Sequence, residues 1–145
     1  MTTPEIYPMP SFTKLSVHDI SASTLWYRDK LAFEMIFEMP GPAGVPVLSH
    51  LRWAKYADLL LLPEGKSGKE RKGVGVSLNF AMGNRSIDKF AEKAISKGVV
   101  NFTGPRDQPW NAREFSLQDP DGYSLTFFQP INMKLSFDEV VNNLD

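Results

Sequence analysis

The fold is decided by residues 108–129, QPWNAREFSLQDPDGYSLTFFQ. Two segments rich in strand-favouring residues, 113–118 and 123–128, flank the tetrapeptide DPDG at residues 119–122. In a tight turn proline presets φ, aspartate bonds its own backbone, and glycine accepts a positive φ without steric cost. The stretch therefore predicts a β-hairpin.

Alternation gives this hairpin two different faces, because successive side chains of a strand point to opposite sides of the sheet. One face is apolar and is expected to form core; it carries Phe115, Leu117, Leu125 and Phe127. The other face is polar with one aromatic side chain, and it carries Glu114, Ser116, Thr126 and Phe128. The second composition is typical of the lining of a binding site, and an ordinary solvated sheet face is the alternative.

The same order of elements occurs twice along the chain. Strands are expected at residues 12–18, 33–39, 47–53 and 58–62, and again at 74–80, 99–103 and in the hairpin; helices are expected to start in residues 19–23 and to cover 87–97. This internal repeat of about 60 residues predicts an α+β fold with two βαβββ modules. The predicted divisions are an N-terminal arm (1–11), a first module (12–63), a linker (64–73), a second module (74–130) and a C-terminal segment (131–145). In the last, Ser136 and Glu139 have the spacing of a helix capping box.

Two such modules, each a curved sheet with a helix on one side, are expected to enclose a groove between them. The residues expected to line it lie opposite the apolar positions of each strand, and they are Phe12, Ser16, His18, Ser77, Asn79, Glu114, Ser116, Thr126 and Phe128. For the third strand, alternation leaves two possibilities open. Either His50 and Arg52 or Leu51 and Trp53 face the groove.

Composition excludes several classes of function. The chain has 145 residues and no cysteine, which excludes disulfides, thiolate metal sites and a cysteine nucleophile. With 16 basic and 17 acidic residues its net charge is −1, so a nucleic-acid partner is not expected. No apolar run approaches the roughly 20 residues that cross a bilayer, and no signal pattern begins the chain, so we expect no membrane partner and a cytoplasmic location.

Taken together, the chain resembles the vicinal oxygen chelate superfamily, which covers glyoxalase I, extradiol dioxygenases, fosfomycin-modifying enzymes and bleomycin-resistance proteins. The resemblance spans roughly residues 11–130 and rests on VHDISASTLWYRDKLAF at 17–33 and on the second helix closing at Gly98. Its most specific part is the run of residues 108–122, with QPW, REF and DPDG, which is most similar to bleomycin-resistance proteins.

The resemblance also locates where the metal of these enzymes would sit. Their divalent ion is held by a histidine near the start of each module's first strand and by a glutamate on the last strand. In this chain those positions fall on Phe12, on Gly75 or Ser77, and on Thr126, none of which binds a transition metal well. We therefore expect no metal, no cofactor and no catalytic residue, and binding in preference to turnover.

Bleomycin-resistance proteins are the metal-free branch, and they sequester a drug in a groove at the interface of a homodimer. Their proline-bearing N-terminal arm reaches across to the partner, a role that Pro8 and Pro10 resemble. The resemblance thus implies a homodimeric small-molecule binding protein that acts by sequestration, with an antibiotic or another planar aromatic ligand. The residues predicted to bind the ligand are Phe12, His50, Trp110, Glu114, Ser116, Thr126 and Phe128.

Other interpretations remain open at this stage. Trp110 also fits a core plug or dimer contact, and Glu114 also fits a salt bridge with Arg113 or Arg52. A divergent metal-dependent lyase or dioxygenase would hold its metal with His18, His50 and Glu114. A protein interaction module would have its groove filled by side chains.

Overall fold

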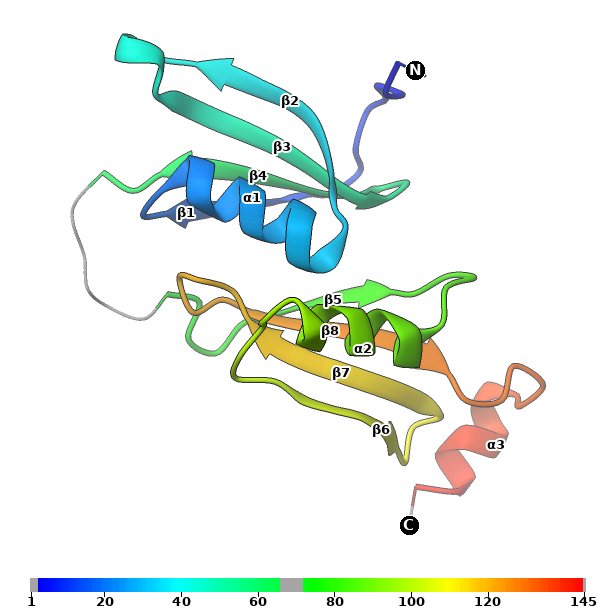
Figure 1. Cartoon of the computed structure of the whole chain (residues 1–145). Helices are drawn as coiled ribbons and strands as arrows, with labels where there is room; N and C mark the ends of the chain where they lie inside the picture. The colour runs from blue at the N-terminus through cyan, green and yellow to red at the C-terminus, as the bar shows by residue number, and fades with distance from the viewer. Residues whose placement is uncertain (1–2, 66–71, 145) are drawn as a thin grey trace. The chain divides into compact units, whose positions relative to one another are not determined.

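The computed structural model describes residues 3–65 and 72–144, and it divides the chain into two compact units, Met1–Glu70 and Arg71–Asp145. Each unit contains one four-stranded mixed sheet with one helix packed on it, in the order βαβββ (Figure 1). The predicted α+β fold of two similar modules is therefore confirmed. Most of the predicted linker, residues 66–71, lies outside the described residues.

The two sheets have the same topology. The first unit contains β1 (Thr13–Val17), α1 (Ile20–Leu31), β2 (Glu34–Pro40), the short 3-10 helix η1 (Pro42–Gly44), β3 (Pro46–Ala54) and β4 (Ala57–Pro63). The second contains β5 (Ser77–Ala81), α2 (Ile87–Ser96), β6 (Thr103–Gln108), β7 (Ala112–Gln118), β8 (Ser124–Pro130) and the terminal α3 (Phe137–Asn142). The strand orders are β1-β4-β3-β2 and β5-β8-β7-β6, and in each sheet the first and last strands of the module pair in parallel while the other pairs are antiparallel.

Helix α1 begins where the sequence predicts, because the side chain of Asp19 accepts a hydrogen bond from the Ala22 amide at 3.0 Å. The buried side of the helix is not a simple apolar stripe, because the side chain of Leu25 is 66% exposed. Ser23 and Thr24 are buried in its place, and the Thr24 hydroxyl donates to Ser49 Oγ at 2.9 Å. A hydrogen bond to β3 thus allows polar side chains on the covered side of the helix.

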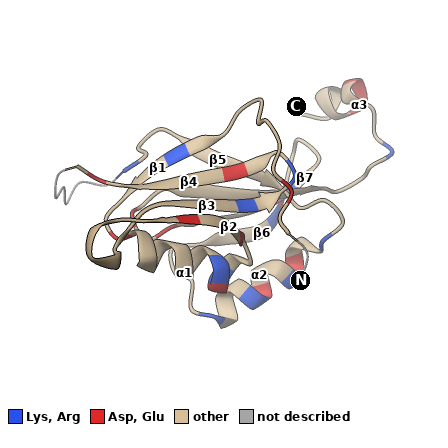
Figure 2. Cartoon of the chain, turned by 90° about the horizontal axis from the view of Figure 1, so that it is seen from above, with Lys and Arg blue, Asp and Glu red and all other residues tan. Residues whose placement is uncertain are grey.

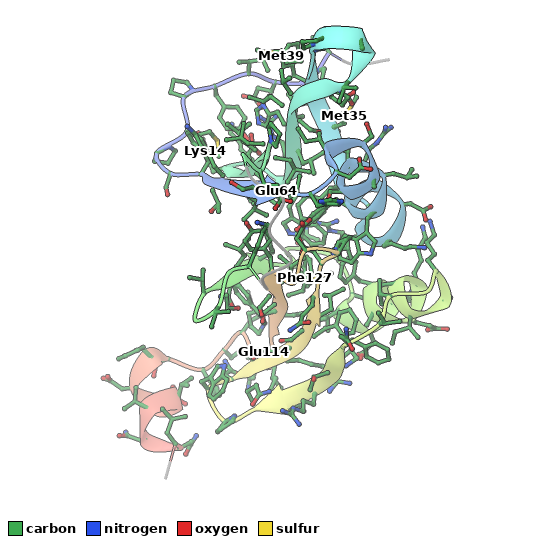
Figure 3. The ribbon with its side chains drawn as sticks, turned by 90° about the vertical axis from the view of Figure 1, so that its left-hand side faces the viewer. Lys14, Met35, Met39, Glu64, Glu114 and Phe127 are labelled. Atoms are coloured by element: carbon green, nitrogen blue, oxygen red, sulfur yellow. The ribbon has the colours of Figure 1, made fainter. Side chains whose placement is uncertain are left out.

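Helix α2 packs on the second sheet through aromatic side chains. Ser86 caps the helix, and its side chain accepts a hydrogen bond from the Lys89 amide at 3.3 Å. The ring of Phe90 lies 4.7 Å from that of Phe127, and the ring of Phe80 stacks on Phe127 at 5.4 Å. Figure 3 shows Phe127 on the side of the second sheet that faces the helix, where these rings form the core of the unit.

Two strand predictions are wrong in their bounds. The fifth strand begins at Ser77 instead of Val74, and Val74 is 72% exposed. The glycines at 73 and 75 have φ of 70° and 82°, so this stretch makes a turn despite its valines. The sixth strand covers Thr103–Gln108 instead of 99–103. Its position depends on pairing with β7, in which Arg106 lies opposite Glu114, and local β-propensity does not determine this pairing.

The hairpin of β7 and β8 has the predicted turn. The amide of Gly122 donates to the carbonyl of Asp119 at 3.0 Å, and Gly122 has φ of 93°. Asp119 Oδ1 accepts hydrogen bonds from the amides of Asp121 and Tyr123, each at 2.9 Å. One carboxylate therefore holds two backbone donors of the turn, and its residue is only 5% exposed.

The C-terminal segment confirms the capping box: Ser136 Oγ accepts from the Glu139 amide, and Glu139 Oε1 accepts from the Ser136 amide. Among the described residues, no helix is long and apolar enough to cross a membrane.

The turn carboxylate gives a stability prediction. Substitution Asp119→Ala leaves two backbone donors without their acceptor, and we expect the free energy of unfolding to fall by about 1–3 kcal/mol. Urea unfolding of the full chain measures the change. Asp119→Asn is the matched control, because its amide oxygen can still accept; an alanine variant as stable as the wild type would contradict this account of the turn.

Candidate functional site

The face of the first sheet that lies opposite α1 is here called the first open face. Leu51 and Trp53 are buried on the helix side, where Trp53 contacts Phe33 with ring centroids 5.3 Å apart. The neighbouring positions, His50 and Arg52, consequently lie on the first open face, which decides the alternative that the sequence left open. Figure 3 shows this sheet with Lys14 on the side away from α1.

A charged network lies on this face, centred on Asp58. The residue is paired with Arg52 in the antiparallel register of β3 and β4, and Figure 2 shows the acidic position of β4 beside the basic position of β3. Arg52 donates from Nε to Asp58 Oδ1 at 2.8 Å and from Nη2 to Oδ2 at 2.9 Å. His50 Nε2 lies 2.6 Å from the same Oδ2. Asp58 therefore joins a guanidinium and an imidazole, and its own side chain is 2% exposed.

The pKa values of this network follow from its geometry. Burial alone raises the pKa of the Asp58 carboxyl, but the hydrogen bonds from Arg52 and His50 and the nearby positive charge outweigh it, so the pKa lies below its ordinary value of 3.8. The hydrogen bond to Asp58 raises the pKa of Arg52. Asp58 is thus an anion and Arg52 a cation near neutral pH.

The N-terminal arm packs on the same network. Arg52 Nη1 donates to the carbonyl of Glu5 at 2.6 Å, and its guanidinium carbon lies 4.5 Å from the centre of the Tyr7 ring. Tyr7 Oη accepts a hydrogen bond from the Tyr56 amide at 2.8 Å. A cavity of about 430 Å³ is bordered by Glu5, Tyr7 and Arg52, together with Glu34 and Lys55. This part of the arm lies on its own chain, and the predicted role of Pro8 and Pro10 in reaching a partner remains a prediction.

A smaller cavity of about 140 Å³ lies on the other side of Asp58. Met9, Phe12 and Leu60 supply its apolar walls, and His50 and Asp58 supply its polar groups. Phe12, which occupies one position where the resemblance implied a metal ligand, therefore lines the same cavity as His50, which the sequence also selected.

The face of the second sheet that lies opposite α2, here called the second open face, carries a chain of hydroxyl groups. Ser116 Oγ lies 2.8 Å from Thr126 Oγ1, and Ser77 Oγ lies 3.5 Å from the same atom. Asn79 Nδ2 donates to Ser77 Oγ at 3.4 Å. Gly75 or Ser77, and Thr126, are the other positions where the resemblance implied metal ligands. Glycine has no side-chain ligand, and neutral hydroxyls are poor ligands for a transition metal.

Trp110 and Glu114 are joined by a hydrogen bond at the end of this sheet. Trp110 lies in the turn between β6 and β7, half of it is exposed, and its Nε1 donates to Glu114 Oε2 at 2.9 Å. Glu114 is paired with Phe128 in the register of β7 and β8. The core-plug interpretation of Trp110 is therefore wrong.

The salt bridges considered for Glu114 are also wrong. Arg113 donates to Asp88 at 2.8 Å and to Asp107 at 3.0 Å. Arg52 has Asp58 as its partner. The carboxylate of Glu114 instead accepts from the indole.

Each histidine contacts one carboxylate. His18 Nδ1 lies 3.1 Å from Glu64 Oε1, and His50 Nε2 lies 2.6 Å from Asp58 Oδ2. In residues 3–65 and 72–144 no three His, Asp or Glu side chains are placed to hold an ion together. The alternative set of His18, His50 and Glu114 stays a prediction.

The seven predicted ligand-binding residues fall into two groups: Phe12 and His50 lie on the first sheet, and Trp110, Glu114, Ser116, Thr126 and Phe128 lie on the second. Sequence reasoning missed Asp58 and Tyr7. Asp58 had a usable signal, because a hairpin turning near Lys55 pairs it with Arg52. Tyr7 had none, because the arm has no periodicity.

The sequence was compared with protein families and with curated proteins. Residues 10–127 match the family described as Glyoxalase/Bleomycin resistance protein/Dioxygenase superfamily. No curated protein matches the sequence.

Solved structures share the fold at low sequence identity. TnmS3, an antibiotic binding protein from Streptomyces sp. CB03234, has 20% identity and a TM-score of 0.65, with 86% of this chain and 97% of that chain covered. A glyoxalase/bleomycin resistance protein from the same organism has 19% identity and a TM-score of 0.63, with 81% and 97% covered. A glyoxalase-related enzyme from Clostridium phytofermentans has 17% identity and a TM-score of 0.66, with 88% and 98% covered.

The Asp58 network predicts how stability changes with pH. Because its pKa is lower in the folded chain than 3.8, Asp58 contributes stability that is complete above that pH and is lost as the pH falls through the folded value. Substitution Asp58→Asn is expected to lower the free energy of unfolding by about 3 kcal/mol near neutral pH, because Arg52 loses its buried counter-charge. It is also expected to remove this component of the acid dependence.

Urea unfolding above and below pH 3.8 measures both effects. Asp88→Asn is the control, because its ion pair with Arg113 is solvent-exposed. If Asp58→Asn and Asp88→Asn lowered the free energy of unfolding equally and left the same dependence on acid pH, the Asp58 network would not stabilise the fold as described.

Proposed function

The chain belongs to the glyoxalase/bleomycin resistance protein/dioxygenase superfamily, and from this membership we propose that it is a metal-free binding protein that sequesters a small planar aromatic molecule, such as an antibiotic. The observation that carries the proposal concerns the positions implied for the metal ligands. They hold Phe12, either Gly75 or Ser77, and Thr126, and the hydroxyl oxygens of Ser77 and Thr126 lie 3.5 Å apart. An aromatic ring and neutral hydroxyls suit an organic ligand better than an ion.

Aromatic side chains supply the binding energy in this proposal. Phe12 and Trp110 are both about half exposed, and Phe128 lies on the second open face next to Glu114. An aromatic contact contributes about 0.5–1.5 kcal/mol beyond the area that it buries. Two such contacts change affinity by roughly one to two orders of magnitude.

The charges of the candidate site favour a neutral ligand over a polycation. The Asp58 carboxylate is matched by Arg52, and the Glu114 carboxylate accepts the indole N–H of Trp110. A cationic glycopeptide such as bleomycin needs acidic groups that are available to it. Planar aromatic compounds without a positive charge are therefore the model ligands for this proposal.

We also propose that the protein works as a homodimer. Phe37 and Met39 of β2 and nearby Val45 are large apolar residues that are 44–62% exposed, and β2 is an edge strand of its sheet. Association would remove this apolar surface from water. Sedimentation equilibrium is expected to give twice the 16.3 kDa of one chain, and Phe37→Glu is expected to give the single-chain mass; a wild-type monomer would contradict the proposal.

Binding is tested by titrating planar aromatic compounds against intrinsic tryptophan fluorescence. We expect saturable quenching, and we expect Phe12→Ala and Phe128→Ala each to weaken binding about three- to tenfold through the loss of one aromatic contact. Trp110→Phe keeps an aromatic ring and identifies how much of the signal comes from this indole.

Metal dependence is tested on the same samples. Treatment with EDTA is expected to leave the affinities unchanged. Stoichiometric metal in the purified protein together with loss of binding after chelation, or no response to any compound, would refute the proposed function.

A further inference from the structure

We propose that His50 is the polar anchor of the ligand and that the ligand is a hydroxylated aromatic ring, whose hydroxyl donates a hydrogen bond to His50 Nδ1. The inference rests on the proposed function, because it takes small-molecule binding as given and assigns the chemistry of the ligand. It is carried by the contacts of the imidazole and by the cavity that it borders.

Asp58 fixes which imidazole nitrogen carries a proton. Its carboxylate accepts two hydrogen bonds from the Arg52 guanidinium, and it is an acceptor only. At 2.6 Å from Asp58 Oδ2, the Nε2 atom of His50 must therefore be the donor. In the neutral ring with a proton on Nε2, Nδ1 has a lone pair and acts as an acceptor.

The acceptor is not used inside the described part of the chain. The contact that His50 makes there is the one to Asp58 through Nε2, and its side chain remains 23% exposed. In the Nε2–H tautomer, Nδ1 is therefore available to accept a hydrogen bond from a ligand that brings a donor.

The neighbouring cavity has the size and lining for one aromatic ring. Its volume is about 140 Å³, and its walls are Met9, Phe12 and Leu60. A cavity of roughly 150 Å³ with aliphatic and aromatic walls holds one benzene molecule. Because the cavity is open to solvent, one ring of a two-ring ligand can enter it while the other ring lies outside, and a substituent of the inner ring can reach His50.

The acceptor selects the kind of substituent. A carboxylate, carbonyl or ether oxygen would meet the lone pair of Nδ1 with another lone pair, and a site that offers an unmatched polar group rejects such analogues. An ammonium group would carry a positive charge into an apolar cavity beside Arg52. A phenolic hydroxyl is neutral and donates, so it satisfies both the nitrogen and the walls.

Three naphthalenes of similar size test the inference by calorimetry: 2-naphthol, 2-methylnaphthalene and 2-methoxynaphthalene. We expect 2-naphthol to bind the full-length protein about five- to tenfold tighter than the methyl compound, as one net hydrogen bond would give, and the methoxy compound to gain nothing. His50→Phe should abolish the preference, and His50→Gln should retain part of it, because its amide can donate to Asp58 or present an oxygen. Phe12→Ala is the matched control, since it should weaken the three compounds alike and leave the preference intact.

Nitrogen NMR of the wild-type protein gives a readout that does not depend on the variants folding. The free protein should show the Nε2–H tautomer of His50, and 2-naphthol should shift the Nδ1 resonance while 2-methylnaphthalene should not. If the three compounds bind equally, if the methoxy compound binds best, or if Nδ1 carries the proton, the inference is overturned while aromatic binding stands. If none of the three compounds binds, the proposed function itself fails.

Discussion

The structure depends on one constraint: each sheet has a single helix to cover it, and the period of two along a strand sends alternate side chains to the covered and the uncovered face. Leu51 and Trp53 lie under α1, so His50 and Arg52 must lie on the other side. In the second unit Phe127 lies under α2, so Thr126 and Phe128 lie opposite. Core and candidate site are thus alternate residues of the same strands, and a shift of one residue in register would exchange them.

Asp58 shows how such an open face acquires a fixed chemistry. A buried carboxylate is unfavourable unless it is paired, and here it is paired by three hydrogen bonds from Arg52 and His50. The same guanidinium then holds the arm through the Glu5 carbonyl and the Tyr7 ring. The network therefore orients the imidazole and also positions Met9 and Phe12, which follow directly in the chain and border the same cavity. One buried anion organises both the polar and the apolar walls.

What the sequence could predict is what local chemistry determines. The DPDG turn, the helix start within residues 19–23 and the capping box at Ser136 each depend on groups only a few residues apart, and all three were predicted. The starts of β5 and β6 were not, because strand bounds depend on pairing with distant strands: valines at 74 and 76 favour a strand, but the positive φ of the neighbouring glycines turns the chain away. The facing of β3 and the contact of Tyr7 likewise needed the register and the path of the arm, which no local pattern contains.

The two modules share a topology but have diverged in the chemistry of their open faces. The first combines an imidazole, a guanidinium and a carboxylate with apolar walls, and the second combines a line of hydroxyls with an indole and a carboxylate. In a metal enzyme of this fold the two modules would supply similar ligands to one ion, and that requirement would keep their open faces alike. Without a shared ion this requirement is absent, and the chemistry of each open face can differ. The divergence of the two faces is therefore what the proposed loss of the metal would produce, and it explains why a fold built by repetition carries a site that is not repeated.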